Sequence, residues 1–349
     1  MKLRVGIVGL GPLWEKRHLP ALRSLADRFE VHGICEQVAH LARRAAGELG
    51  TVAVEGFRAL AARDDIDAIL YLSDQWYGVA PILAACDHGK AVYAGASLPV
   101  DAAGADSLSR RVEESGIAFM TELPRRYAPA TMRLKELIAT RLGAPRMLFC
   151  HRRVPQTTPS ATVPPRDRTS EARDLMELVD WCRYVAGTEP TSVVAVRHAE
   201  VPGGAVDDYQ MMSLDFTSQG SPGNGPIAQI SCGYYIPAMW EEAVGFRPPS
   251  ALQVACEKGI AFVDHPAGLV WFDTAGRHQE SLDADRSVGE QMLLQFHRKV
   301  TSLVRPHSGL DEVLRAMQVI QAAAVSQLEG RRVALDAGGH GPGRPEAPC

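Results

Sequence analysis

The chain has 349 residues, 46% of them hydrophobic, and a formal net charge of -4, a composition typical of a globular protein with two domains. This charge provides no broad cationic surface for a nucleic-acid backbone, and no apolar run approaches the length that crosses a membrane. The seven cysteines are scattered without a Cys-x-x-Cys pair, which indicates buried thiols in a reducing compartment. We therefore expect a cytoplasmic protein without nucleic-acid or membrane partners.

The first third of the chain alternates β-rich runs with amphipathic helical segments. This rhythm predicts an α/β fold of the Rossmann type, with a doubly wound parallel sheet. The opening run enters glycines before any cleavage site, so it predicts a strand and not a signal peptide. The expected strands are Leu3–Leu10, Val31–Cys35, Ala68–Leu72, Ala91–Tyr93 and Ala118–Glu122. The expected helices are Lys16–Arg28, Val38–Leu49, Val79–His88 and Ala103–Glu114.

After about Pro124 the pattern changes to longer strands in succession. Strands without crossover helices predict an α+β domain with a largely antiparallel open sheet. The expected strands are Arg146–Val154, Thr191–Val201, Tyr209–Phe216, Ile227–Ile236, Ala251–Val263 and Leu269–Thr274. The expected helices are Ala130–Leu142, Glu171–Val185, Val288–Val304 and Leu310–Leu328.

This change of pattern sets the expected domain boundaries. Residues 1–124 are predicted to form a dinucleotide-binding domain, and residues 125–335 a substrate and oligomerisation domain. The Gly/Pro-rich residues 336–349 are expected to be a disordered tail. The proline-rich segment Pro155–Ser170 is either a lid over a site or a plain surface loop.

A Gly-x-Gly pair, Gly9 and Gly11, joins the first expected strand to a helix. In a βαβ unit the first glycine permits the tight turn, and the second lets the backbone approach a pyrophosphate held by amides at the helix start, here near Leu13 and Trp14. Glu36 ends the second strand, where a carboxylate binds the ribose 2′-hydroxyl and repels a 2′-phosphate, so NAD is expected over NADP. The alternative is a tight turn beside a solvated Glu36, with the Trp14 indole shifting the helix start or narrowing the pocket.

Further motifs follow in a fixed order along the chain. They are Val5–Gly11 with His18–Leu22, Asp65–Ile69, Gly89–Tyr93, Glu122 with Arg125–Pro129, and Asp180–Gly187. In this order and spacing the chain resembles, from about Leu3 to Val333, the Gfo/Idh/MocA family, which includes glucose–fructose oxidoreductase and inositol dehydrogenase. The resemblance implies an N-terminal Rossmann domain, a C-terminal domain whose open sheet carries homo-oligomer contacts, and NAD(P)-dependent chemistry at a carbinol carbon of a sugar, cyclitol or related compound.

The lysine motif of the family is replaced in this chain. After Gly-Lys-x-Val the family reads Glu-Lys-Pro, but the corresponding residues here are Gly95, Ala96 and Ser97. The lysine ammonium of the family lowers the pKa of the reacting hydroxyl and holds it in place, and a methyl group does neither. None of the six lysines lies in a matching motif, so the standard mechanism of alcohol oxidation is not expected.

The second catalytic motif of the family, Asp-x-x-x-His-x-x-Asp on a helix, aligns with Arg173, Glu177 and Asp180. These residues share one face of the expected helix, and the resemblance makes them the catalytic candidates. Glu177, at the position of the histidine, can accept a proton if it is buried. A salt bridge between Arg173 and Glu177 at i,i+4 spacing is the equal alternative.

The resemblance also implies positions that contact the ligands. Cofactor contacts are implied at Ser73, Asp74, Gln75, Gly95 and Glu122. Substrate contacts are implied at Ala96, Arg125 and Arg126. The two arginines would grip an anionic or polyhydroxylated ligand, or they would form ion pairs across the domain hinge instead.

The sequence therefore predicts an NAD(P)-binding oxidoreductase that acts on a sugar-like alcohol or carbonyl compound with altered acid–base residues. One alternative is an inactive family member that keeps the fold and the dinucleotide as a sensor or assembly partner. Another uses bound NAD(H) for internal redox cycling in a lyase or glycosidase reaction, which requires the same missing groups. No metal site is expected, because the histidines form no cluster with the spacing of metal ligands.

Overall fold

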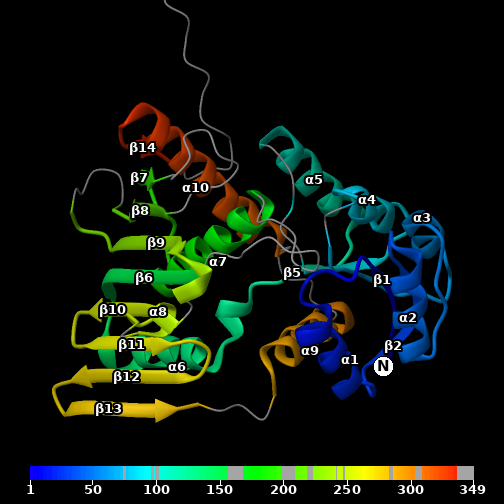
Figure 1. Ribbon diagram of the computed structural model, residues 1–349, viewed down its shortest axis with the longest axis horizontal. Helices are drawn as coiled ribbons and strands as arrows, with labels where there is room; N and C mark the ends of the chain where they lie inside the picture. The colour runs from blue at the N-terminus through cyan, green and yellow to red at the C-terminus, as the bar shows by residue number, and fades with distance from the viewer. Residues whose placement is uncertain are drawn as a thin grey trace, which may run out of the picture. The chain divides into compact units, whose positions relative to one another are not determined.

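The computed structural model describes residues 1–73, 76–95, 98, 102–155, 168–198, 209–217, 223–240, 242–246, 248–282, 286–302 and 309–335. The chain forms two compact units (Figure 1). The first comprises Met1–Pro124 and Asp285–Leu314, and the second comprises Arg125–Ala284 and Arg315–Cys349. The predicted tail at 336–349 and most of the segment Pro155–Ser170 lie outside the described residues.

The first unit is built on a parallel sheet of five strands in the order β2-β1-β3-β4-β5. Every residue of β3 and of β4 is buried, as expected for parallel strands that are covered by helices on both faces. The predicted Rossmann-type α/β fold is confirmed. The strands are β1 (Leu3–Val8), β2 (Phe29–Cys35), β3 (Ala68–Tyr71), β4 (Ala91–Ala94) and β5 (Phe119–Thr121).

The first helix of this unit begins with one π-helical turn, η1 (Trp14–His18), and continues as α1 (Leu19–Ser24). It therefore starts earlier and ends earlier than the predicted helix Lys16–Arg28. The short helix α3 (Phe57–Ala61) was not predicted, because five residues are too few to show a helical period. The other helices are α2 (Ala39–Leu49), α4 (Ala80–Asp87) and α5 (Ala102–Ser115).

Helix α9 (Val288–Thr301) belongs to the first unit, whereas the sequence placed these residues in the second domain. Aromatic packing accounts for its position: the ring of Phe296 lies edge-on to Tyr93 of β4, with 5.5 Å between centroids. His297 contacts the ring of Phe29 at 5.7 Å and bonds the carbonyl oxygen of Met1 at 2.8 Å. An amphipathic helix shows that one of its faces is buried, but not against which sheet.

The second unit is built on a sheet of nine strands in the order β13-β12-β11-β10-β6-β9-β8-β7-β14. Its neighbouring strands pair antiparallel except for β6 and β9, which run parallel. The predicted, largely antiparallel open sheet is confirmed. The strands are β6 (Pro145–Pro155), β7 (Ser192–His198), β8 (Tyr209–Asp215), β9 (Ile227–Ile236), β10 (Leu252–Cys256), β11 (Ile260–Asp264), β12 (Gly268–Asp273), β13 (Gly276–Ser281) and β14 (Val333–Ala334).

The prediction of one strand over Ala251–Val263 is wrong, because the chain turns within it and forms the hairpin β10–β11. The amide of Cys256 donates to the carbonyl oxygen of Gly259 at 2.8 Å, which closes the turn. A side chain at position 259 would collide with the backbone of Phe272. The Glu-Lys-Gly sequence was the turn signal, because glycine is the residue that most often marks such a turn.

Helices α6 (Pro129–Leu137) and α7 (Arg168–Ala186) pack on the sheet of the second unit, α6 on β11 and β12 and α7 on β6 and β9. Helix α10 (Leu310–Glu329) joins β7 through Ser326, whose hydroxyl accepts the amide of Ala195 at 3.0 Å. Among the described residues, no helix is long and apolar enough to cross a membrane. The shorter helical segments are η2 (Pro124–Tyr127), η3 (Ile138–Leu142), η4 (Ala238–Trp240) and α8 (Glu242–Gly245).

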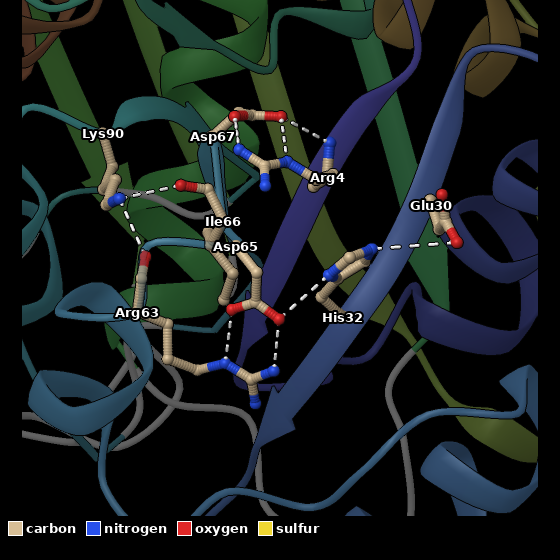
Figure 2. A network of polar contacts seen from close by, with 8 residues as sticks. All are labelled: Arg4, Glu30, His32, Arg63, Asp65, Ile66, Asp67 and Lys90. Carbon is tan, nitrogen blue, oxygen red and sulfur yellow. Dashed lines mark hydrogen bonds and ion pairs between the residues drawn. The ribbon is translucent and has the colours of Figure 1, made fainter.

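The amino ends of the parallel strands carry a network of charged side chains (Figure 2). Arg4 of β1 holds Asp67, just before β3, through both its backbone amide and its guanidinium group, at 2.6–3.1 Å. Lys90, just before β4, donates to the carbonyl oxygens of Arg63 and Ile66 at 2.9 and 2.8 Å. The motifs at Asp65–Ile69 and Gly89–Tyr93 therefore fix strand ends at the edge of the sheet that lies opposite the carboxyl ends of the strands.

Asp67 provides a pH-dependent test of this network. Its hydrogen bond to Arg4 holds the pKa of this carboxyl below its usual value, although burial opposes the shift. The ionised form is therefore stabilised by folding, and this stability is present above the unfolded-state pKa and is lost as the pH falls through the lowered folded value. We expect Asp67→Asn to lower the urea midpoint at pH 7, with a difference from wild type that shrinks below about pH 4.

The matched control is Asp27→Asn. The side chain of Asp27 is 69% exposed and pairs with its neighbour Arg28, so this change should alter the urea midpoint little at any pH. A deficit of Asp67→Asn that stays constant from pH 7 to pH 3 would contradict the role given to the Arg4–Asp67 pair.

Candidate functional site

The bend after β1 depends on two glycines. Gly9 and Gly11 have φ angles of 70° and 63°, which side-chain-bearing residues rarely adopt. A Cβ atom at position 9 would lie 2.7 Å from the Cβ of Ser73. A Cβ at position 11 would collide with the carbonyl oxygen of Leu72. The loop therefore lies directly against the chain that follows β3, and positions 9 and 11 have room only for glycine.

The backbone amides of the bend fall into two groups. The amide of Gly9 donates to the carbonyl oxygen of Cys35 at 2.9 Å, and that of Leu10 donates to the Glu36 carboxylate at 2.8 Å. For the amides of Gly11 and Leu13, no residue in the described part of the chain is an acceptor. Two donors at the start of a helix suit an oxyanion such as a phosphate.

Trp14 is buried, with 4% of its surface exposed. The helix begins at this residue with the π-helical turn, in which the amides of Arg17 and His18 both donate to the carbonyl oxygen of Leu13, at 2.9 and 3.3 Å. The helix therefore starts at Trp14 with a π-helical turn.

A cavity of about 780 Å³ lies beyond the end of β2, which is a size that suits a nucleoside. Its lining includes Glu36, whose other carboxylate oxygen accepts the amide of Val38 at 3.3 Å. Tyr77 closes one wall and packs edge-on to Phe57, with 5.2 Å between ring centroids. The remaining lining residues include Ala39, Ala42, Arg43, Ala53, Val54 and Arg58.

At the carboxyl ends of β4 and β5 lies a buried charged cluster, which we call the Glu122 cluster and which consists of Glu122, Arg17 and His18. Glu122 is 6% exposed; Arg17 Nη1 lies 2.6 Å from one of its oxygens and His18 Nε2 lies 3.3 Å from the other. Burial alone would raise the pKa of this carboxyl, but its bond to His18 and the charge of Arg17 together lower it. Glu122 is therefore an anion between these partners.

The other cofactor candidates fall into two groups. Ser73 is buried against Gly9, and Gly95 follows β4 beside Glu122. The cofactor candidates Asp74 and Gln75 and the substrate candidate Ala96 lie outside the described residues. Among the described residues, His, Cys, Asp and Glu side chains form no group that could hold a metal ion.

A second polar cluster lies in the second unit, and we call it the Glu177 cluster. Glu177 of α7 lies 3.4 Å from Arg125 Nε and 3.6 Å from an Arg152 nitrogen. Asp174, three residues earlier, pairs with Arg152 at 2.8 Å and accepts the hydroxyl of Tyr234. Burial raises the pKa of Tyr234 above its usual range, so its hydroxyl keeps its proton.

The sequence analysis did not identify Asp174, Arg152 and Tyr234 as members of this cluster. A signal was available for Asp174, which lies three residues from Glu177 and so shares its face of the helix. Arg152 on β6 and Tyr234 on β9 meet it only through strand pairing, which the sequence does not reveal. Arg173 lies one turn before Glu177 on α7 and is half-buried.

Asp180 is held between two arginines in the interior of the second unit. It is 1% exposed, and Arg126 donates to both of its oxygens at 2.8 and 2.5 Å. Arg183 approaches it at 3.4 Å and also pairs with Glu189. Next to Asp180, the ring of Trp181 lies under the guanidinium group of Arg125 at 4.9 Å. These contacts give Asp180 and Arg126 a structural role.

Residues 3–122 match the family model of the Gfo/Idh/MocA oxidoreductases, which is described as an oxidoreductase family with an NAD-binding Rossmann fold. The match covers the part of the chain that forms the five-stranded parallel sheet. A curated relative, D-xylose 1-dehydrogenase (NADP(+)) 2 of Haloferax volcanii, is 29% identical over 140 residues, which span 40% of this chain and 42% of that protein.

Solved structures extend the likeness to both units. Aldose–aldose oxidoreductase from Caulobacter crescentus, complexed with glycerol, has a TM-score of 0.81 at 17% identity and covers 96% of this chain and 100% of its own. Levoglucosan dehydrogenase, in complex with NADH and levoglucosan, has a TM-score of 0.80 at 17% identity and covers 96% of this chain and 99% of its own. At this identity the likeness shows a shared fold over nearly the whole chain.

The structural role of Asp180 leads to a prediction on stability. Asp180→Asn removes the buried carboxylate that Arg126 and Arg183 share, although Arg183 keeps its pair with Glu189, and should cost about 3–5 kcal/mol of unfolding free energy. The control Asp87→Asn removes an ion pair with Arg111 whose side chains are 51% and 41% exposed, and it should cost under about 1 kcal/mol. Urea unfolding measures both, and equal small losses would contradict the role of Asp180.

Proposed function

We propose that the protein is an NAD(P)-dependent oxidoreductase that transfers hydride between the nicotinamide cofactor and a sugar, cyclitol or related alcohol or carbonyl compound. The observation that carries this proposal is the bend after β1, where the two glycines leave the amides of Gly11 and Leu13 without protein acceptors among the described residues. The xylose, aldose and levoglucosan enzymes to which the chain is similar support the substrate class.

The cofactor would be held by the first unit. The amides of Gly11 and Leu13 would bind the pyrophosphate, and the cavity lined by Glu36, Arg43 and Tyr77 would take the adenosine. We propose NAD as the preferred form, because a 2′-phosphate would meet the negative charge of Glu36. Bound there, the cofactor supplies a nicotinamide ring that accepts or donates hydride.

Glu177 is the proposed proton acceptor, in place of the histidine at this position of the family motif. Its carboxylate lies between Arg125 and Arg152, two side chains that offer further N–H donors to a polyhydroxylated substrate. Such donors hold a hydroxyl by hydrogen bonds, as the missing lysine would, but they do not give up a proton. The active site is thus proposed to differ from the family pattern in its acid–base group.

We also propose a homo-oligomer that forms through the outer face of the nine-stranded sheet. This face exposes apolar side chains on several strands: Met147 is 48% exposed, Val196 51% and Ile227 50%. Large exposed apolar patches on a sheet are typical of protein interfaces. A cytoplasmic location is proposed with it, because the six described cysteines are buried and free.

Gly11→Ala tests the cofactor cradle. The added methyl group collides with the Leu72 carbonyl oxygen and destabilises the backbone conformation by about 1–3 kcal/mol, so the loop should shift and the Kd for NADH should rise about tenfold or more. The control is Gly47→Ala in α2, where a Cβ meets no atom within 4 Å and should leave binding unchanged. Fluorescence titration with NADH and NADPH measures both variants, and unchanged binding by Gly11→Ala contradicts the proposed cradle.

Glu177→Gln tests the acid–base proposal. Removing a general base should lower kcat on an active aldose or cyclitol by about a hundredfold or more, with the Kd for NADH unchanged because Glu177 is not among the residues proposed to hold the cofactor. NADH formation over a panel of sugars and cyclitols measures the effect. Cofactor binding without turnover on any member of the panel would instead favour the inactive, dinucleotide-sensing alternative.

A further inference from the structure

The carboxyl ends of β4 and β5 lie side by side, and their next residues are Gly95 and Glu122. The amide of Gly95 donates to the carbonyl oxygen of Tyr71, and the amide of Glu122 donates to that of Ala94, both at 2.8 Å. Position 95 is where the glutamate of the family's Glu-Lys-Pro motif would stand. In this chain the residue at that position has no side chain, and a carboxylate reaches the same place from the neighbouring strand.

The space at position 95 is filled by the Glu122 cluster. A Cβ atom built on Gly95 would lie 2.9 Å from Glu122 Oε2, 3.1 Å from a methyl carbon of Leu72 and 3.4 Å from His18 Nε2. The first of these distances is shorter than a carbon–oxygen contact allows, and the carboxylate is itself fixed by Arg17 and His18. Any side chain at position 95 would therefore have to displace Glu122.

Glu122 binds the turn that begins the first helix. Both of its partners, Arg17 and His18, belong to η1, and their amides share the carbonyl oxygen of Leu13. Leu13 carries one of the two amides proposed to hold the pyrophosphate. The carboxylate thus connects the end of β5 to the residue that ends the glycine loop.

The His18 ring has a defined tautomer in this cluster. Its side chain is 4% exposed, and Nδ1 has no hydrogen-bond partner in the described part of the chain. A proton on Nδ1 would be a buried donor without an acceptor, which costs about 1–3 kcal/mol. A neutral ring would therefore carry its proton on Nε2, which lies 3.3 Å from Glu122 Oε2.

We propose that Glu122 is the positioning residue of the cofactor cradle, and that position 95 is glycine because this carboxylate occupies the space of its side chain. Glu122 acts through Arg17 and His18 and holds Leu13 and the helix start in the conformation that presents the two amides. The role of the cradle rests on the proposed function. That Glu122 occupies the space of a side chain at position 95 rests on the contacts alone.

A double-mutant cycle in the full-length protein without cofactor tests whether Glu122 occupies the space of a side chain at position 95. Gly95→Ala should lower Tm by roughly 5 °C or more in the wild-type background, because it displaces a buried charge. In the Glu122→Ala background the same change should lower Tm by less than half as much. Gly47→Ala, in open space on α2, should not lower Tm in either background. Equal losses in both backgrounds overturn this occupancy, and Glu122→Asp, whose carboxylate is one methylene shorter, replaces Glu122→Ala in the cycle if the latter does not fold.

Two further measurements test the positioning role. The ¹⁵N shifts of His18 should show the proton on Nε2 in the wild type and a changed proton distribution in Glu122→Gln, whereas a proton on Nδ1 in the wild type contradicts the assignment. The Kd for NADH should rise about tenfold in Glu122→Gln and stay unchanged in Glu15→Gln, whose side chain is 69% exposed. Wild-type protein that binds neither NADH nor NADPH refutes the proposed function and the role of Glu122 in the cradle. In that case the double-mutant cycle still decides whether Glu122 occupies the space at position 95, and the ¹⁵N shifts still decide the position of the His18 proton.

Discussion

The glycine loop after β1 lies in direct contact with the backbone that follows β3, and much of the first unit is arranged around this contact. Gly9 and Gly11 have no room for a Cβ atom on the side of Leu72 and Ser73. The positive φ angles that this contact requires direct two of the loop amides toward Cys35 and Glu36 and leave those of Gly11 and Leu13 without acceptors among the described residues. The constraint is thus structural in origin, and the two amides without acceptors among the described residues follow from it.

Charge is used differently in the two units. In the first unit, charged side chains at the amino ends of the strands, such as Arg4 and Lys90, hold neighbouring segments of the sheet together. At the carboxyl ends of the strands, Glu122 instead binds Arg17 at the start of the first helix. In the second unit, Asp180 is enclosed by Arg126 and Arg183, whereas Glu177 retains partial exposure between Arg125 and Arg152. The difference in burial separates a carboxylate that is enclosed by the fold from one that keeps some contact with solvent.

The sequence predicted a parallel and a largely antiparallel sheet, because the apolar runs and the turn residues are local signals, but it did not predict the turn between β10 and β11 or the strand β13. It also placed Gly9 and Gly11 in the bend after the first strand and Glu36 at the end of the second strand, because these positions follow from the order of strand, loop and helix. It could not place α9, whose partners Tyr93 and Phe29 are about two hundred or more residues away along the chain. Nor could it show that Glu122 fills the space at Gly95, because that relation depends on how β4 and β5 pair.

The central claim is that the loop presents the amides of Gly11 and Leu13 to a diphosphate. The most direct measurement is the amide NMR spectrum of the ¹⁵N-labelled protein during titration with NADH. The account predicts large shifts for Gly11 and Leu13 and smaller ones for Gly9 and Leu10, whose amides are already bonded to Cys35 and Glu36. Signals of Gly11 and Leu13 that do not move while NADH binds would contradict it.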